Sequence, residues 1–256
     1  MAAIPAQYRE TIVTPKQSRN IEAIWSYVAS KRGTTTILPD GRCDIILRFN
    51  INGSGAIIPI VTGPATHPYA VSVSPDEAWV GIRLRPDQGA SIWDSDIKFA
   101  KNKILRGACA IDKIPMLASV IRAEHNIPSV KAALVEIPML AQPTVSNIET
   151  VQAIEYIHTT GGRLRVSALA KFLSCSTRQL NRVFHTSVGI TAKPYCSLVQ
   201  FHRTLRLIEN ESLSLSETAF EAGYADQAHM ARTVKKFSGF APSQLPFDLT
   251  TPNLFS

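Results

Sequence analysis

The sequence predicts an α+β protein in which a β-rich N-terminal domain, barrel- or sandwich-like, is followed by an all-α domain. Short apolar runs separated by Gly and Pro turns occupy residues 34–86, a pattern typical of small barrels and sandwiches. Beyond residue 146 apolar residues recur at helical spacing. A length of 256 residues suits two domains. Prolines interrupt the pattern between the two regions, so we predict domains at residues 1–142 and 146–256.

Four segments of the first domain carry a strand signal, because they are short, apolar or alternating, and bounded by turn residues: 43–50, 56–63, 67–73 and 78–86. The last of them alternates apolar residues with Arg83 and Arg85. We expect these two arginines to form a solvated face, with binding of an anionic effector as the alternative. The segment 21–30 fits a strand or a helix. Cys43 lies in an apolar run and is interpreted as a small core residue.

Helical spacing predicts two helices that close the first domain and six that make up the second: 112–125, 129–140, 148–160, 166–173, 176–189, 194–210, 214–223 and 226–239. Several of these helices begin at residue pairs that form capping boxes, or at a capping aspartate: Ser146 with Glu149, Ser176 with Gln179, Ser214 with Glu217, and Asp226. Glycines at 161, 162 and 239 are expected to end helices.

The second domain contains an internal repeat. Residues 166–189 align with residues 215–239, and Arg182 falls on Arg232. The aligned positions are 49 residues apart in the first helix and 50 in the second, so the extra residue lies in the turn. Each unit is a short helix, a tight turn and a second helix, which is the helix-turn-helix layout. The sequence therefore predicts two similar modules joined by one long helix.

The second helix of each module carries a candidate DNA-contacting face. In the first module Leu180, Val183 and Phe184 share the face expected to pack in the core. A basic, amide-bearing opposite face fits the edges of guanine and adenine, and a capped helix start fits a phosphate. A solvated helix face is the alternative for either helix alone, but two copies favour DNA. The predicted contact residues are Ser176, Thr177, Arg178, Asn181, Arg182, His185, Gln227, Ala228, Ala231, Arg232, Lys235 and Lys236.

Charge favours an anionic partner, and no motif indicates catalysis. The net charge is +7, and residues 156–208 hold eight Lys and Arg but no Asp or Glu. The four cysteines lack metal-site spacing, so we expect no metal, no cofactor and no catalytic residues. No apolar run approaches the ~20 residues of a membrane span, and no signal peptide is visible at the start. We therefore expect a cytoplasmic protein that is not an enzyme and does not contact a membrane.

Two motifs resemble the AraC/XylS family of transcription regulators. The first is L-x-R-x-F…G at residues 180–189, and the second is GYADQAHMAR…FSGFAPSQL at residues 223–245. The N-terminal half also resembles the sensor region of one AraC subgroup, through LPDGRCDIIL at 38–47 and VGIRLRPDQGA at 80–90. Three positions depart from the family pattern, which usually has Arg at 200, Phe at 234 and Pro at 192: Gln200, Val234 and Ala192.

The resemblance implies a sequence-specific DNA-binding transcription regulator, an activator by its usual role, that contacts double-stranded DNA through two adjacent modules. It also implies a first domain that senses a small-molecule effector or dimerises, with RNA polymerase as a further partner. The residues that would bind the effector are unknown from the sequence. Two alternatives remain: a ligand-independent DNA-binding dimer whose first domain only dimerises or contacts a protein, and a DNA-binding domain fused to an enzyme domain.

Overall fold

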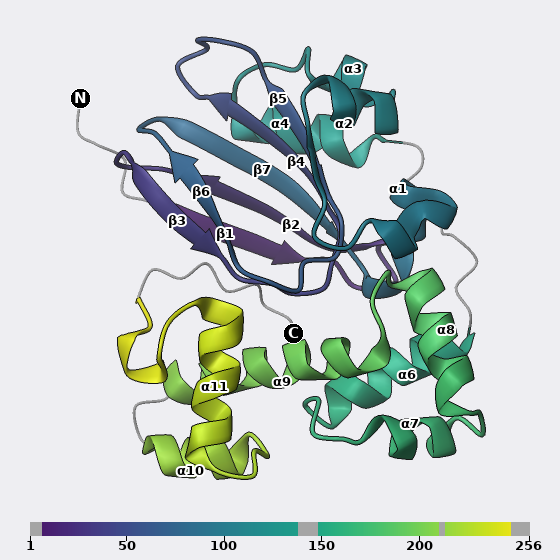
Figure 1. Cartoon of the computed structure of the whole chain (residues 1–256). Helices are drawn as coiled ribbons and strands as arrows, with labels where there is room; N and C mark the ends of the chain where they lie inside the picture. The colour runs from purple at the N-terminus through teal and green to yellow at the C-terminus, as the bar shows by residue number, and fades with distance from the viewer. Residues whose placement is uncertain (1–6, 138–147, 210–212, 247–256) are drawn as a thin grey trace.

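The computed structural model describes residues 7–137, 148–209 and 213–246. A β-rich region occupies the upper part of the molecule in Figure 1, and a group of helices lies below it. This arrangement confirms the predicted α+β class, with strands first and helices second along the chain.

An open six-stranded antiparallel sheet is the centre of the β-rich region. Its order is β1-β2-β7-β4-β5-β8, and the strands are Gln7–Ile12, Ile21–Val28, Glu77–Leu84, Asp44–Asn50, Ile58–Thr62 and Ile104–Arg106. The segment 21–30, which fitted either a strand or a helix, forms β2. Strands β1 and β8 are the two edges of the sheet, so the sheet is not closed and the barrel alternative is wrong.

A second, two-stranded sheet packs against one face of the first. It consists of β3 (Gly33–Ile37) and β6 (Tyr69–Val73), paired antiparallel. Val73 of this sheet is buried in one apolar cluster with Ile46, Ile60 and Trp79 of the larger sheet. The β-rich region is therefore a two-layer arrangement, as the sandwich alternative predicted.

Short helices cover the opposite face of the large sheet. They are α1 (Ala90–Trp93), α2 (Ala108–Lys113), α3 (Leu117–Val120) and α4 (Ile127–Val135), with 3-10 turns at Pro86–Gln88 and Asp94–Phe99. Because both of its faces are covered, β7 is buried along its whole length. Its apolar residues Val80, Ile82 and Leu84 face these helices in one cluster.

The predicted single helix at 112–125 is wrong, because the chain forms α2 and α3 there instead. Pro115 lies between them, and proline disfavours the helical conformation in the residue before it. Ile114 accordingly adopts φ −130° and ψ 88°. The helix predicted at 129–140 corresponds to α4, which begins after Asn126; the Asn126 side chain accepts the N–H of Ser129.

The second half consists of helices, six of them within the residues described. They are α6 (Ile148–Thr159), α7 (Val166–Phe172), α8 (Thr177–Ser187), α9 (Ala192–Glu209), α10 (Leu215–Glu221) and α11 (Gln227–Ser238), followed by a 3-10 turn at Pro242–Gln244. The predicted caps Ser176, Ser214 and Asp226 all accept backbone N–H groups. Gly239 ends α11 with φ 86°, a left-handed value that favours glycine. Ser146 lies outside the described residues.

One apolar cluster holds the six helices together, and it includes Leu180, Phe184, Met230 and Phe237. Val183, which we placed on the same core face, is only half-buried. Leu38 also belongs to this cluster, although it comes from the β-rich half of the chain. The boundary proposed between residues 142 and 146 lies outside the described residues and stays a prediction.

Leu180→Ala should destabilise the protein far more than Arg178→Ala. Leu180 is 2% exposed, and truncating a buried leucine costs about 2–5 kcal/mol. Arg178 is exposed on the other side of α8, where a substitution changes stability by about 0.5 kcal/mol or less. Thermal unfolding of the full chain measures both, and equal shifts in melting temperature would show that the face assignment is wrong.

Candidate nucleic-acid interface and interior cavity

Helix α8 presents the first candidate DNA-contacting face. The Ser176 hydroxyl accepts the N–H of Gln179, so the helix begins at Thr177 with its start exposed. Arg178 and Arg182 are exposed and lie one turn apart, on the side opposite the buried Leu180. Both guanidinium groups are therefore within reach of a second molecule.

Two other predicted contact residues of α8 are half-buried, Asn181 and His185. The Asn181 side-chain oxygen accepts the backbone N–H of Ala192 at 3.3 Å. Asn181 therefore links the middle of α8 to the first residue of α9. The contacts of both residues with DNA stay predictions.

Helix α11 presents the second candidate face. The Asp226 carboxylate accepts the N–H of His229 at 2.6 Å and caps the helix. The His229 ring packs edge-on against Tyr224, with ring centroids 5.2 Å apart, so it supports the turn. Ala231 is half-buried, and the remaining predicted contact residues of this helix are exposed: Gln227, Ala228, Arg232, Lys235 and Lys236.

Helix α9 separates the two modules. Its 18 residues span about 27 Å at ~1.5 Å per residue, and α8 and α11 lie near its opposite ends (Figure 1). Gln200 of α9 donates hydrogen bonds to the carbonyl oxygens of Ala222 and Gly223, at 3.0 and 3.2 Å. Glutamine at this position, where the family usually has arginine, therefore joins α9 to the turn of the second module.

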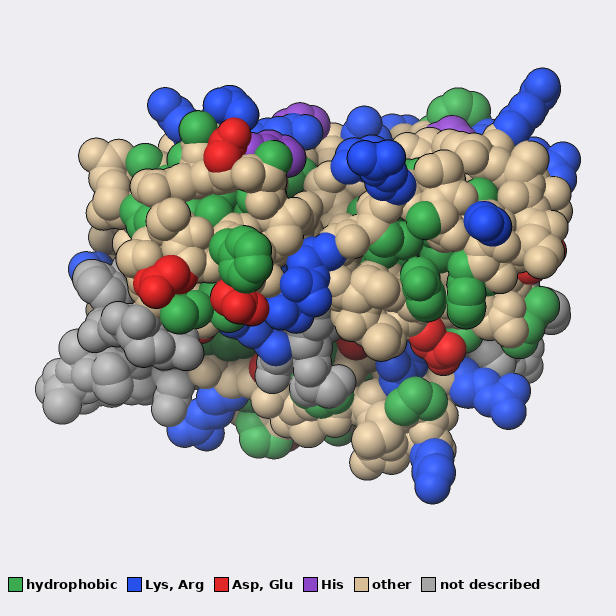
Figure 2. Space-filling model, turned by 90° about the horizontal axis from the view of Figure 1, so that it is seen from below, with side chains coloured by type: hydrophobic (Ala, Val, Ile, Leu, Met, Phe, Trp, Pro, Cys, Tyr) green, Lys and Arg blue, Asp and Glu red, His purple; other side chains and the backbone are tan. Residues whose placement is uncertain are grey.

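The surface of the helical half carries many basic side chains. Figure 2 shows the molecule from below, with Lys and Arg side chains along the edges and over the middle of the face and Asp and Glu side chains interspersed. In the acid-free stretch, seven of the eight Lys and Arg side chains are exposed: Arg163, Arg165, Lys171, Arg178, Arg182, Lys193 and Arg206. Such a surface suits a polyanion.

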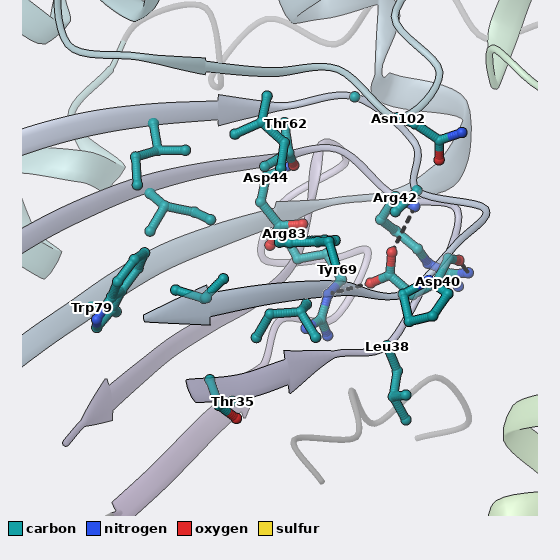
Figure 3. Close-up of a pocket in the computed structure, with 18 of the residues that line it drawn as sticks. Thr35, Leu38, Asp40, Arg42, Asp44, Thr62, Tyr69, Trp79, Arg83 and Asn102 are labelled. Atoms are coloured by element: carbon teal, nitrogen blue, oxygen red, sulfur yellow. Dashed lines mark hydrogen bonds and ion pairs between the residues drawn. The ribbon is translucent and has the colours of Figure 1, made fainter. Parts of the chain in front are cut away.

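A cavity of about 260 Å³ lies between the two sheets of the β-rich half (Figure 3). The large sheet contributes an apolar and aromatic wall that includes Trp25, Tyr27, Ile46, Ile60, Trp79 and Ile104, and the small sheet contributes Thr35, Ile37, Tyr69, Val71 and Val73. A side chain on Gly81 would collide with the Trp25 indole, since a Cβ there would lie 2.3 Å from Trp25 Cε2. Glycine at 81 therefore lets Trp25 lie across β7.

Polar residues gather at one end of the cavity, around Asp44. Its carboxylate accepts the indole N–H of Trp25 at 2.9 Å, and its backbone N–H donates to the Thr62 hydroxyl at 2.9 Å. Burial raises the pKa of Asp44 to about 7, although the nearby Arg83 acts to lower it. Asp44 and Arg83 are paired across β4 and β7 and point to the same face.

The expected solvated face of Arg83 and Arg85 is wrong. Arg83 is 4% exposed; its Nε lies 3.1 Å from an Asp40 carboxylate oxygen, and it also pairs with Glu10. Arg85 is half-buried and donates to the carbonyl oxygen of Val13. The physical reason is that the small sheet packs over this face of the large sheet, and β1, two strands from β7 in the large sheet, supplies Glu10.

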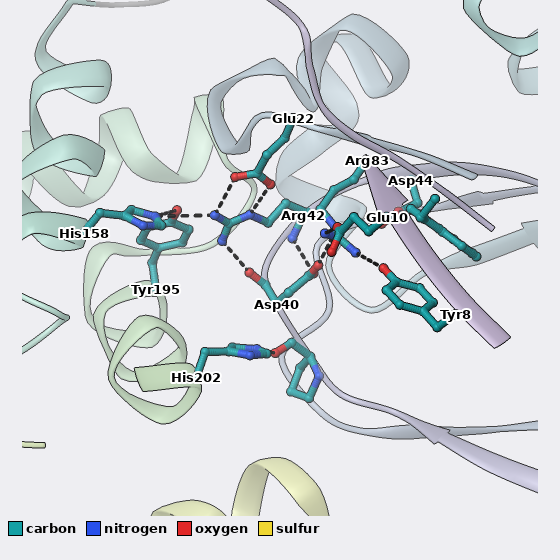
Figure 4. Close-up of polar contacts among 12 residues, drawn as sticks. Tyr8, Glu10, Glu22, Asp40, Arg42, Asp44, Arg83, His158, Tyr195 and His202 are labelled. Carbon is teal, nitrogen blue, oxygen red and sulfur yellow. Dashed lines mark hydrogen bonds and ion pairs between the residues drawn. The ribbon is translucent and has the colours of Figure 1, made fainter. Parts of the chain in front are cut away.

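Arg42 forms the centre of a buried polar cluster between the two halves (Figure 4). Its guanidinium, with 0% exposure of the side chain, donates to both Glu22 carboxylate oxygens at 2.9 and 3.0 Å. Burial acts to raise the pKa of Glu22, but the ion pair with Arg42 outweighs it and lowers the pKa. Across the junction Arg42 Nη2 lies 3.4 Å from His158 Nε2, and the guanidinium lies 5.5 Å from the centre of the Tyr195 ring.

Residues 38–42, which we call the junction segment, contact the cavity and the helices together. Leu38, Asp40 and Arg42 line the cavity, while Leu38 packs into the helical core. The His202 Nε2–H of α9 donates to the carbonyl oxygen of Pro39 at 2.8 Å, and burial lowers the pKa of His202 to about 4. His202 is therefore neutral near pH 7 and holds α9 to the junction segment.

The sequence analysis did not find the polar residues of this site, although their pattern was visible. Asp40, Arg42 and Asp44 alternate at the entrance to a buried strand, and alternate residues of a strand share a face. Three charges on one face of an otherwise apolar run are unusual in a core, and this was the available signal.

No cluster of three or more His, Cys, Asp or Glu suited to a metal ion occurs within residues 7–137, 148–209 and 213–246. In the same ranges no helix is long and apolar enough to cross a membrane.

Comparisons with known proteins agree with this geometry. Residues 169–245 match a family model described as a helix-turn-helix domain, and residues 14–106 match one described as a domain of unknown function, DUF6597. The helical half is thus a DNA-binding helix-turn-helix domain. In this domain the chain is similar to the AraC-type helix-turn-helix proteins, a class of transcription regulators.

The relatives differ in how much of the chain they share. The Msm operon regulatory protein of Streptococcus mutans serotype c is 32% identical over 118 residues, which are 44% of this chain and 42% of that protein. The chain thus spans less than half of the length of this curated relative. Among solved structures, ToxT from Vibrio cholerae is 12% identical with a TM-score of 0.48, covering 95% of this chain and 99% of that chain. The C-terminal domain of AraT from Geobacillus stearothermophilus is 23% identical with a TM-score of 0.37, covering 40% and 85%.

Arg42→Met should destabilise the full chain by about 3–5 kcal/mol, because it leaves Glu22 buried without its ion-pair partner. The double variant Arg42→Met, Glu22→Gln removes both charges and should recover at least part of the loss. Denaturant unfolding of the wild type, both single variants and the double variant measures the coupling between the two residues. A loss below about 1 kcal/mol for Arg42→Met, the range of an exposed pair, would contradict a stabilising role at the junction.

Proposed function

We propose that the chain is a sequence-specific transcription regulator whose DNA binding is controlled by a small molecule held in the cavity between the two sheets. The observation that carries this proposal is the junction segment, which lines the cavity and also packs into the helix-turn-helix domain. A ligand that contacts Asp40 or Arg42 therefore contacts residues that hold the DNA-binding half in place.

The two modules would enter successive major grooves of one duplex. Helix α9, about 27 Å long at ~1.5 Å per residue, separates α8 from α11, and successive major grooves on one side of a duplex lie ~34 Å apart. Arg178 and Arg182 of α8 are free to meet base edges, whereas α11 offers Ala228 and Arg232 at the matching positions. Since alanine has no hydrogen-bonding group for base recognition, the first module supplies most of the sequence specificity. The second supplies mainly affinity and register.

Control by the ligand would act through a shift between two arrangements of the junction. Arg42 bonds to Glu22 in the β-rich half and lies against His158 and Tyr195 in the helical half. A ligand that binds one arrangement of this cluster more tightly shifts the population toward it. The orientation of the two modules, and hence their fit to DNA, changes with that population.

Arg178→Ala and Arg182→Ala should relax base preference in one half of the DNA site by about 1–3 kcal/mol each. Lys235→Ala should weaken binding to all sequences alike, because a lysine at the end of α11 meets only phosphates. Binding-site selection with the full chain measures the preference. Salt titration should give a slope of log K against log salt near −5 if about six phosphates are neutralised, with Lys235→Ala flatter by about one unit.

Two binding results would contradict this mode of DNA recognition. If the better-defined half of the selected site belongs to α11, and the Arg178 and Arg182 variants keep full preference, the assignment of specificity to α8 is wrong. An affinity that does not change with salt would contradict DNA binding through the basic face altogether.

Ligand control predicts reciprocal coupling between the cavity and DNA. Trp25 and Trp79 line the cavity, so a fluorescence screen of metabolites reports binding, with Trp93 outside the cavity as an internal reference. A ligand found in this way should change DNA affinity by about 5–150-fold, and DNA should change ligand affinity by the same factor. His202→Phe, which removes the hydrogen bond to Pro39, should reduce this coupling while ligand affinity stays within about twofold. Cavity ligands that leave DNA affinity unchanged would favour the ligand-independent alternative.

A further inference from the structure

The cavity has two chemically different ends. Arg83 and Asp44 lie at one end, and Trp79 lies four residues away from Arg83 on β7, which is about 13 Å at ~3.3 Å per residue. Between them the walls are apolar and aromatic. A ligand that fills this space has one polar group and an apolar body.

Acidic and basic side chains meet at the polar end: Asp40, Asp44, Arg42 and Arg83 line the cavity there, whereas Glu10 and Glu22 contact the two arginines without lining it. Within the described residues, four buried or nearly buried carboxylates surround two buried guanidinium groups: Glu10, Glu22, Asp40 and Asp44 around Arg42 and Arg83. Arg42 bonds to Glu22, and Arg83 forms ion pairs with Glu10 and Asp40, although the Arg83 Nε–H makes no hydrogen bond within the described residues. An anionic ligand at this end would therefore compete with Glu22, Glu10 and Asp40 for guanidinium groups that are already ion-paired.

Asp44 is the carboxylate of this group without a direct ion pair among the described residues, although Arg83 lies near it on the adjacent strand. Among the described residues, no Lys, Arg or His nitrogen forms an ion pair with it, and its one side-chain hydrogen bond comes from the Trp25 indole. A buried charge without a partner is costly, so the carboxyl either takes up a proton or is neutralised by a cation. The raised pKa of Asp44 agrees with this conflict.

The walls beside Asp44 suit a cation with an apolar body. Trp25, whose N–H orients the carboxylate, and Tyr69 both line the cavity, and aromatic faces attract ammonium groups. The buried indole N–H of Trp79 has no hydrogen-bond partner within the described part of the chain, so the far end also leaves one polar atom unsatisfied. An engineered cavity of about 150 Å³ holds benzene, so 260 Å³ has room for a ring and a short chain.

We propose that the ligand of this cavity is a small organic amine, bound as its cation to the Asp44 carboxylate, with an aromatic or aliphatic body between the sheets. This inference rests on the proposed function, in that the cavity is the effector site. The exposed Lys103 and Arg106 lie at the rim, and they define the opposite possibility, an anionic ligand held at the mouth.

Three matched probes distinguish these possibilities: 4-phenylbutylamine, 4-phenylbutan-1-ol and 4-phenylbutyrate. They share one body and differ in the charge of the terminal group. Isothermal titration with the full chain near pH 8, where Asp44 is ionised, should show the amine binding at least tenfold more tightly than the alcohol. The carboxylate should bind more weakly than the alcohol.

Asp44→Asn is the decisive variant, because asparagine keeps the size of the side chain and an oxygen for the Trp25 N–H. It should weaken the amine at least tenfold and leave the alcohol unchanged within about twofold. Unchanged binding of the alcohol also shows that the variant is folded, and a thermal melt checks this independently. Asp112→Asn, at an exposed acid on α2, is the matched control and should leave all three affinities unchanged.

Three results would overturn the proposal: no binding of the amine at millimolar concentration, a carboxylate that binds as well as the amine, or an Asp44→Asn variant that keeps the affinity for the amine. Failure of the proposed function looks different. In that case the amine binds in an Asp44-dependent manner, but the affinity of the saturated protein for DNA is the same as without it.

Discussion

The arrangement of the two halves depends on the buried guanidinium of Arg42. A fully buried charge is tolerated only when its donors are satisfied, and Glu22, the Asp40 carbonyl oxygen and His158 Nε2 do this together. Glu22 belongs to β2, Asp40 to the loop before β4 and His158 to α6. One side chain therefore joins a sheet, a loop and a helix. The aromatic ring of Tyr195 closes the remaining side. Arg42 thereby fixes where α6 and the start of α9, which carries Tyr195, lie against the β-rich half.

The β-rich half combines two conflicting demands, burial and charge. Its large sheet is covered on one face by helices and on the other by the small sheet, which is the usual solution for an apolar sheet. Yet the covered face carries Asp44 and Arg83, and it leaves a cavity where a protein selected for stability alone would place larger side chains. Such departures from good packing concentrate where a protein binds something. The position of Gly81, which makes room for Trp25, indicates that the space is shaped rather than left over.

Sequence reasoning was most successful where local signals act alone. The caps at Ser176, Ser214 and Asp226 and the burial of Leu180 follow from residues a few positions apart, and the repeat of the modules is visible in the sequence itself. It was wrong for Arg83, because the burial of this residue depends on a strand more than seventy residues away that supplies Glu10. The cavity was not predictable for the same reason, since its walls come from eight strands. Asn181 shows a further case: we predicted that it contacts DNA, but it is half-buried, and its bond to the N–H of Ala192 depends on where the next helix begins.

Leu38 belongs to the wall of the cavity and to the core of the helices. A core residue shared by two layers makes their stabilities interdependent, because neither layer can open fully without exposing it. We therefore expect the two halves to unfold together rather than one after the other. In evolutionary terms, this position restricts how freely such a sensor region and such a DNA-binding region can be recombined. A new partner for either half must supply a pocket for this leucine as well as a matching linker.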